Sequence, residues 1–390
     1  MDFKVLDSIL EIDESVWNNL HHSKNPFVQH AFLAALEKHG CVSERFGWFP
    51  KHFVAFEAGQ PVAAMPLYEK HNNYGEFVFD HAWYQAWQSV GLNYYPKLVS
   101  AAPYTPAVGP RLFVRSDFSD RPVTIQPILE ALKDFTDEQG YSGFHILFDD
   151  AQSDYVNDRE ILCRHDVQFQ WFNQGYEGFE DFLAALKPKK RKNIRQERRA
   201  IAEQDLTFDV LNGHSATEDD WHDFNVFYHK TFLDKFSTPT LNLDFFLEIA
   251  KTMPESLVLV MVRRKTQAIA GALMFRSDKV LYGRHWGAIE QVKHLHFETC
   301  FYQGIDYAIA NGLERFEPGA GGEHKVARGF VPVKMQSSHW LSVNPFEQGI
   351  QGFLAEEKRM IQSYCQEVWQ SVPYQETEAL LKASQSISKW

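Results

Sequence analysis

The sequence lacks most of the features that identify the common enzyme and membrane-protein classes. It contains no P-loop, no Gly-x-Gly-x-x-Gly, no Gly-x-Ser-x-Gly and no His-Glu-x-x-His motif, which argues against kinases, dinucleotide oxidoreductases, serine hydrolases and zinc proteases. The longest apolar run, residues 257–262, is far shorter than the about 20 residues of a membrane-spanning helix. Residues 1–7 lack the basic and apolar parts of a signal peptide. We therefore expect a cytoplasmic protein with no membrane insertion.

Cysteine is scarce and metal-binding patterns are missing. The four cysteines, at positions 41, 163, 300 and 365, are too scattered for a disulfide framework or a CxxC site, so we expect reduced thiols. His294 and His296 are two residues apart, a spacing that places both side chains on one side of a strand. No further ligand follows at a diagnostic spacing, so no metal site is expected. Glu298 suits the first turn of the helix that follows.

Positive charge is in the minority, with 39 Lys and Arg against 51 Asp and Glu and a net charge of −12. This balance argues against nonspecific nucleic-acid binding by the whole surface. One segment departs from it, the basic run of residues 187–199. As a helix from about Lys189, this run would turn Ile194 and Ile201 inward and its cations outward. The cations could bind the phosphates of a nucleotide, a pantetheine carrier or RNA, or they could form a solvated helix face. The candidate carrier-binding residues are Lys190, Arg191, Lys192 and Arg195.

Apolar and aromatic residues are plentiful, at 44% and 15% of the 390 residues, which is typical of a folded globular chain. At about 150 residues per domain this length suggests two domains. The order of predicted elements occurs twice: a helix, a hairpin, a strand, a helix and a strand. The elements of the first copy are predicted near residues 26–40, 54–68, 74–81, 125–138 and 144–148, and those of the second near 239–252, 260–275, 280–285, 297–311 and 315–317.

This repeat predicts the fold class and the division of the chain. Strands that first form hairpins and are then joined through a helix favour an α/β protein with mixed sheets and helices on their faces. The boundary is expected near Gly175 to Gly178, which gives an N-terminal domain of residues 1–175 and a C-terminal domain of residues 176–390. A last helix begins after Asn344-Pro345 and is expected to pack on the second copy.

The segment with the densest functional chemistry follows the short strand at 315–317. Glycines at 319, 321 and 322 allow positive φ and close approach of the backbone to a ligand. The turn then presents Glu323, His324, Lys325 and Arg328 within six residues. An acid, an imidazole and two cations can supply a general base and a clamp for an anionic or carbonyl group. The alternative is a solvated polar turn.

Other polar residues lie at the ends of predicted strands. His285 and Arg284 follow Tyr282 on one strand, and Asp80-His81 end the corresponding strand of the first copy. A histidine at such a position can line a cleft, although a core histidine with satisfied hydrogen bonds is more common. Glu317, at the end of the strand before the glycine turn, is a further candidate base.

Several of these segments resemble the predicted N-acyltransferases of the FemAB-like, peptidoglycan-biosynthesis-associated family. The resemblance runs over nearly the whole chain. It is carried by Asn25-Pro-Phe27, Gly47-Trp48, Tyr74 to Trp83, Tyr95-Pro-Lys97, Pro103-Tyr-Thr-Pro106, Gly109-Pro-Arg111, Lys190 to Arg195, Tyr282-Gly-Arg284, Leu295-His-Phe-Glu298, Gly322-Glu-His-Lys325 and Ala327-Arg-Gly329.

The resemblance implies two tandem GNAT-type (acyl-CoA N-acyltransferase) folds and acyl transfer onto an amine. CoA-dependent relatives bind pyrophosphate with a basic, glycine-rich loop, whereas the corresponding residues 288–297 contain no glycine. Fem-type ligases take an aminoacyl group from tRNA, a donor that the basic run would suit. The expected co-substrate is therefore acyl-CoA or aminoacyl-tRNA, with no tightly bound cofactor and no metal.

We accordingly predict an enzyme that forms an amide from an activated acyl or aminoacyl donor and an amine acceptor. The candidate catalytic residues are Glu317, Glu323, His324 and His285. The candidate substrate-binding residues are Lys325, Arg328, Arg284, Asp80, His81 and Glu298. The alternative is a non-catalytic protein that recognises a cell-wall precursor or RNA.

Overall fold

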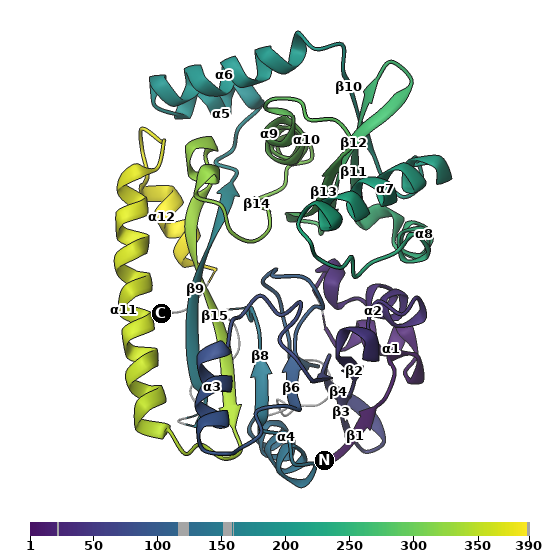
Figure 1. Cartoon of the computed structure of the whole chain (residues 1–390), viewed down its shortest axis with the longest axis vertical. Coiled ribbons are helices and arrows are strands. Elements are labelled where there is room, and N and C mark those ends of the chain that lie inside the picture. The colour runs from purple at the N-terminus through teal and green to yellow at the C-terminus, as the bar shows by residue number, and fades with distance from the viewer. Residues whose placement is uncertain (22, 116–124, 151–157, 159, 388–390) are drawn as a thin grey trace. The chain divides into compact units, whose positions relative to one another are not determined.

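The computed structural model describes residues 1–21, 23–115, 125–150, 158 and 160–387 (Figure 1). These residues form two compact units. Unit 1 comprises residues 1–166, 334–363 and 387–390, and unit 2 comprises residues 167–333 and 364–386. Within the described residues, no helix combines the length and apolarity needed to cross a bilayer.

Unit 1 contains a small antiparallel sheet with the strand order β1-β3-β4-β7. Its strands are β1 (Asp2–Leu6), β3 (His52–Glu57), β4 (Gln60–Met65) and β7 (Phe113–Val114). The hairpin between β3 and β4 turns at Ala58 and Gly59, both with positive φ, as its sequence predicts. The sheet contributes Phe53, Val62 and Met65 to an apolar core.

The other strands of unit 1 follow the order β15-β8-β6-β5-β2. They are β2 (Trp48–Pro50), β5 (Tyr68–Lys70), β6 (Lys97–Ser100), β8 (Gly143–Ile146) and the end of β15 (Val331–Leu341). The strands β6 and β8 are parallel, and helix α4 (Gln126–Glu138) lies between them in the chain. Leu129 and Leu132 of α4 are buried against Phe144 in the same core as the small sheet.

Unit 2 has the strand order β10-β11-β12-β13-β14-β9. Its strands are β10 (Thr207–Leu211), β11 (Leu257–Arg264), β12 (Gln267–Arg276), β13 (Val280–Ala288), β14 (Arg315–Glu317) and the end of β9 (Leu162–Phe172). The pair β13 and β14 is parallel and the other pairs are antiparallel. Each unit therefore has one parallel pair whose strands are connected through a helix, which confirms the mixed α/β class.

Helices account for most of the remaining described chain. In unit 1 they are α1 (Glu14–Asn19), α2 (His30–Lys38) and α3 (His81–Ser89). In unit 2 they are α5 (Phe179–Ala185), α6 (Pro188–Ala202), α7 (Glu218–Asp234), α8 (Leu243–Thr252), α9 (Leu295–Phe297), the π-helix η6 (Glu298–Tyr302), α10 (Gln303–Ala310), the 3₁₀ helix η7 (Glu323–Arg328) and α12 (Glu378–Gln385). Helix α11 (Glu347–Ser371) contributes residues to both units.

The strand that follows each copy of the repeat ends in the other unit. β9 follows β8 in the chain, but its residues Trp171 and Phe172 pair with β14 of unit 2. β15 follows β14 in the chain, but its residues 338–341 pair with β8 of unit 1. Unit 1 therefore includes residues 334–363, which follow most of unit 2 in the chain.

The strand predicted from Tyr74 to His81 is wrong. Residues 71–80 form turns and irregular structure, and His81 is the first residue of α3. Two buried lysines determine this conformation, since Lys70 and Lys97 bind backbone and side-chain oxygens of the segment. Their contacts replace the ladder of hydrogen bonds that a strand would need.

Candidate functional site

The parallel pairing of unit 2 ends where several predicted site residues lie. β13 pairs with β14 only from Val280 to Tyr282, and β13 then continues for six residues beyond that pairing. On its other side β13 pairs with β12, and the register there passes from Gly283 to His285 and skips Arg284. Arg284 is thus the extra residue of a β-bulge. Bulges of this kind often occur beside active sites, where they redirect a side chain.

The glycine turn after β14 is held by a buried lysine. The Nζ atom of Lys325 donates to the carbonyl oxygens of Gly319, at 2.7 Å, and Ala320, at 3.1 Å. Burial lowers the pKa of Lys325 to about 8. Sequence reasoning assigned Lys325 to substrate binding, whereas its ammonium group contacts the backbone of its own turn.

His324 lies exposed on the outside of this turn and rests on aromatic side chains. Its ring centroid is 5.7 Å from that of Phe297 and 5.7 Å from that of Phe301, and 6.3 Å from that of His296. Burial of one ring face, together with the charges of Lys325 and Arg328, lowers the pKa of His324. The imidazole is therefore neutral at neutral pH and can accept a proton.

The conformation of Gly322 makes room for this ring. A Cβ atom at position 322 would lie 2.6 Å from Cε1 of His324, and the φ of Gly322 is +89°. Only glycine meets both conditions without strain.

Arg328 connects the turn to α6. Its guanidinium donates to both carboxylate oxygens of Glu197, at 2.7 and 3.2 Å, and to the carbonyl oxygen of His324 at 2.8 Å. The same guanidinium carbon lies 3.4 Å from the centroid of Phe297. The hydroxyl of Tyr302 also donates to Glu197. Arg328 thus fixes the backbone of His324 and the ring beneath it.

A π-helix lies next to His324 and Arg328. Residues 298–302 carry i→i+5 hydrogen bonds, a geometry that is rare and frequently found at functional sites. Glu298 on this segment binds Arg198 of α6 at 3.1 Å, and Arg198 also binds Asp306 at 2.7 Å. Burial raises the pKa of Glu298 although Arg198 opposes the effect. The predicted substrate-binding Glu298 is thus buried and paired with α6.

The three other predicted catalytic residues have different surroundings. Glu317 is buried and forms an ion pair with Arg315 at 3.0 Å. Desolvation lowers the pKa of His285 well below its usual range, and its ring packs edge-on against Tyr228. Glu323 is exposed and accepts a hydrogen bond from the hydroxyl of Tyr364 at 2.7 Å.

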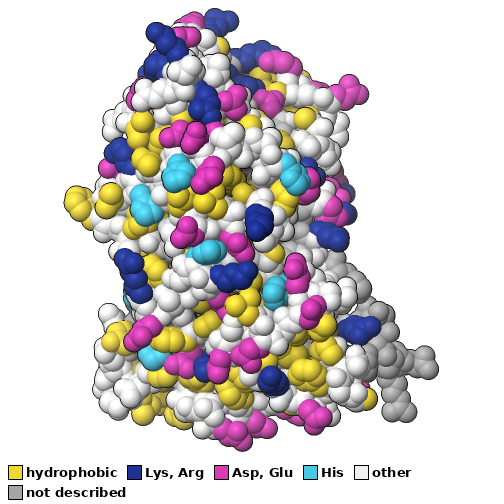
Figure 2. Space-filling model, turned by 90° about the vertical axis from the view of Figure 1, so that its right-hand side faces the viewer, with side chains coloured by type: hydrophobic (Ala, Val, Ile, Leu, Met, Phe, Trp, Pro, Cys, Tyr) yellow, Lys and Arg dark blue, Asp and Glu magenta, His cyan; other side chains and the backbone are white. Residues whose placement is uncertain are grey.

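The candidate carrier-binding cations lie on α6, which begins at Pro188 and buries Ile194 and Ile201 as predicted. Two of these cations bind the protein itself: Arg191 donates to two backbone carbonyls, and Arg195 pairs with Glu180. Within the described residues, Lys190 and Lys192 have neither a hydrogen-bond nor an ion-pair partner. Figure 2 shows Lys and Arg side chains gathered at the end of unit 2 that carries α6, with acidic side chains beside them.

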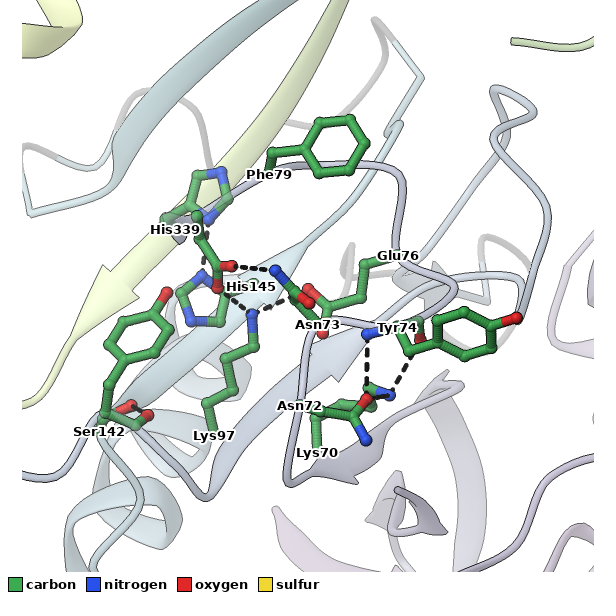
Figure 3. Close-up of polar contacts among 12 residues, drawn as sticks. Lys70, Asn72, Asn73, Tyr74, Glu76, Phe79, Lys97, Ser142, His145 and His339 are labelled. Carbon is green, nitrogen blue, oxygen red and sulfur yellow. Dashed lines mark hydrogen bonds and ion pairs between the residues drawn. The ribbon is translucent and has the colours of Figure 1, made fainter. Parts of the chain in front are cut away.

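A second polar cluster lies in the interior of unit 1 (Figure 3). The ammonium group of Lys97 binds Glu76 at 2.8 Å and Asp80 at 2.5 Å, and all three side chains are at most 5% exposed. Burial disfavours the charge of Lys97, but the two carboxylates outweigh this effect and raise its pKa. The predicted Asp80 is thus an internal ion-pair partner. His81 lies at the surface, with its ring near Phe79.

Sequence reasoning did not select Glu76, Lys97 or the histidine pair beside them. Nδ1 of His145 lies 2.7 Å from Nδ1 of His339, so one ring donates and the other accepts. Burial lowers the pKa of both histidines well below the usual range. The sequence contains one indication of this cluster, because Tyr74 to Trp83 and Tyr95 to Lys97 both carry the family resemblance. The fold brings these two segments together. The chain as far as it is described has no cluster of three or more His, Cys, Asp or Glu suited to a metal ion.

Segments that carry the resemblance therefore lie in both units. A family model for FemAB-like proteins, described as peptidoglycan biosynthesis/recognition, matches residues 8–376. The chain belongs to the FemAB-like family. No curated protein matches its sequence.

Solved structures with the fold of this FemAB-like chain are distant in sequence. A domain of a candidate lysylphosphatidylglycerol synthetase from Agrobacterium fabrum matches with a TM-score of 0.52 and 11% identity, over 90% of this chain and 96% of that one. A protein of unknown function from Bacteroides thetaiotaomicron matches with a TM-score of 0.51 and 11% identity, over 87% and 100%. FemX matches with a TM-score of 0.49 and 10% identity, over 87% and 97%. The first two likenesses support the fold alone.

Proposed function

We propose that this FemAB-like protein is an N-acyltransferase that forms an amide from an activated acyl or aminoacyl donor and an amine acceptor. The observation that carries the proposal is the position of His324: an exposed, neutral imidazole on the glycine turn that follows β14, held by Gly322 and Arg328. Membership of a family described by peptidoglycan biosynthesis/recognition supports a peptidoglycan precursor as the source of the amine.

The reaction requires one proton acceptor and one leaving group. The amine nitrogen attacks the carbonyl carbon of the donor and forms the C–N bond, and its proton passes to a ring nitrogen of His324. The tetrahedral intermediate then collapses, the bond to the carrier breaks, and the departing thiolate or alkoxide takes up a proton. A base with a pKa below neutrality is already unprotonated when the amine arrives.

The two cations of α6 without a partner among the described residues, Lys190 and Lys192, are the proposed site for a polyanionic carrier. Lys190 and Lys192 can bind phosphates, whereas Arg191 and Arg195 already bind oxygens of the protein. Either CoA or tRNA would supply such phosphates. Binding should weaken as the salt concentration rises, since each neutralised phosphate releases counterions.

The experiment is a comparison of the variants His324→Gln and Glu323→Gln. Glutamine in place of His324 keeps a polar side chain but cannot accept the proton, so we expect turnover to fall by about 10²- to 10⁴-fold with an unchanged melting temperature. Glu323 is the neighbouring candidate base, so loss of turnover in Glu323→Gln together with wild-type turnover in His324→Gln would assign the base to Glu323 instead. Wild-type turnover in His324→Gln would contradict the assignment of the base.

The same assay separates catalysis from recognition. Thermal-shift measurements with acyl-CoAs, charged tRNA and muropeptides report binding without turnover, and a ligand at 100 times its Kd adds about 2.7 kcal/mol of stability. Binding of a muropeptide or RNA without transfer from any donor would favour the alternative of a non-catalytic recognition protein.

A further inference from the structure

The end of α7 in unit 2 carries an unusual phenylalanine. The amide of Phe236 donates to the carbonyl of Leu233 at 3.0 Å, and the amide of Ser237 donates to the carbonyl of Phe232 at 2.9 Å. These two bonds define a Schellman motif, in which the residue at the position of Phe236 adopts a left-handed conformation. The φ of Phe236 is +52°. Glycine is the favoured residue there, because a Cβ atom makes this conformation unfavourable.

Burial of the ring does not compensate for this strain. Phe236 is 100% exposed, and Leu233, one turn earlier, is 67% exposed. The opposite face of α7 is packed normally, with Phe224, Phe227 and Tyr228 buried. Phe236 thus has a backbone conformation that disfavours a side chain and a large apolar ring that is not buried. Positions where sequence and local structure disagree in this way are commonly functional.

A chain of contacts leads from α7, at Thr231, to the candidate base. The hydroxyl of Thr231 donates to the carbonyl of Trp286 at 2.8 Å, and the Trp286 ring packs edge-on against His296 with centroids 5.5 Å apart. His296 in turn lies next to His324. Burial lowers the pKa of His296 to about 4, and the charge of Lys235, the residue before Phe236, contributes to this effect.

We propose that Leu233 and Phe236 form a surface subsite for the apolar chain of an acyl donor whose carbonyl group is delivered to His324. This inference rests on the proposed function, because it assumes that the protein transfers an acyl group. It adds the class of that group: a medium- or long-chain acyl group in place of an acetyl or a polar aminoacyl group. Two side chains are enough to contact an alkyl chain. They are too few for a protein partner, because each side of a stable protein interface buries about 800 Å². A bilayer surface is a less suitable partner, since the chain carries a net charge of −12.

The test compares wild-type protein with Phe236→Gly and with Val226→Ala. Glycine relieves the strain at the helix end, so the melting temperature of Phe236→Gly should stay the same or rise, and loss of binding could not be attributed to unfolding. Val226 is 55% exposed on the same helix and serves as the control for removing an exposed apolar group.

The probes are four unreactive thioethers: S-octyl-CoA, S-ethyl-CoA and the octyl and ethyl thioethers of N-acetylcysteamine, which lack the nucleotide. We expect the octyl probes to bind wild-type protein more tightly than the ethyl probes and to shift the methyl resonances of Leu233. Phe236→Gly should weaken octyl binding by about tenfold, with little effect on the ethyl probes or in Val226→Ala. Equal octyl affinity in Phe236→Gly and wild type, or no preference for the octyl chain, would overturn the subsite.

Two further results distinguish the subsite from the transfer reaction and from a membrane contact. Chain-length-dependent binding without transfer would retain the subsite and refute the proposed function. Transfer that is independent of chain length would support the proposed function and refute the subsite. Binding of wild-type protein, but not Phe236→Gly, to phosphatidylcholine–phosphatidylglycerol vesicles, with no response to the octyl probes, would replace the acyl subsite with a membrane contact.

Discussion

Replacement of Lys97 by methionine should strongly destabilise unit 1. The side chain of Lys97 is 1% exposed and neutralises Glu76 and Asp80 at 2.8 and 2.5 Å, so the variant leaves two buried carboxylates without a counter-charge. Removing one partner of a buried ion pair costs about 3–5 kcal/mol. Burial already raises the pKa of Glu76 in the wild-type protein. Its protonation should relieve the repulsion, so the defect of Lys97→Met should be smaller at low pH than at high pH.

Urea unfolding monitored by far-ultraviolet circular dichroism, at several pH values, measures this loss. The matched control is the neutral triple variant Lys97→Met with Glu76→Gln and Asp80→Asn, which removes all three charges. Replacing a buried ion pair by neutral groups of similar size is often close to neutral for stability, so this variant should recover most of the lost free energy. A loss below about 1 kcal/mol in the single variant, or no recovery in the triple variant, would refute the assignment of Lys97 as an essential internal counter-ion.

Two other perturbations have defined outcomes. Burial lowers the pKa of His145 and His339 in the folded protein. Below about pH 6.5 the unfolded chain therefore binds protons that the folded protein does not. The free energy of unfolding should fall as the pH drops below that value. The double variant His145→Gln with His339→Gln should show a shallower slope in the same pH titration, and an unchanged slope would contradict the reasoning. Gly322→Ala should reduce transfer nearly as much as His324→Gln, because its Cβ would displace the imidazole. Gly321→Ala, whose Cβ meets no atom within 4 Å, should keep its turnover and lose only about 1 kcal/mol to backbone strain.

Local sequence signals predicted the elements of the fold well. The hairpins, the helix over 126–138, the basic helix with Ile194 and Ile201 inward and the short strand before the glycine turn all follow from periodicity and turn residues. The strand predicted over 74–81 was wrong because the sequence does not show that Lys70, just before this segment, and Lys97, further along the chain, are buried and bind its oxygens.

The sequence predicted the local part of the candidate site but not the contacts between distant segments. The glycine spacing indicated a turn that presents His324, and the structure has this turn. The contact of Arg328 with Glu197 depends on a residue placed by the tertiary fold, which sequence spacing does not report. The contacts of Lys325 lie within its own turn, but spacing does not show that the side chain folds back on the backbone. The roles of Glu317, Glu323, His285 and Arg284 stay predictions, and so does the division of the repeat near residue 175.

The exchange of β9 and β15 has a consequence for how the protein is made. Phe144 of β8 pairs with Trp340 of β15, so unit 1 lacks its terminal strand until nearly the whole polypeptide has left the ribosome. Contacts between residues so distant in sequence form slowly, and an unpaired strand edge is prone to aggregation in the meantime. For the same reason a fragment ending at residue 175 would separate β9 from its partner β14 and leave β8 paired with β6 but not with β15, so a cut at this residue does not separate the two compact units.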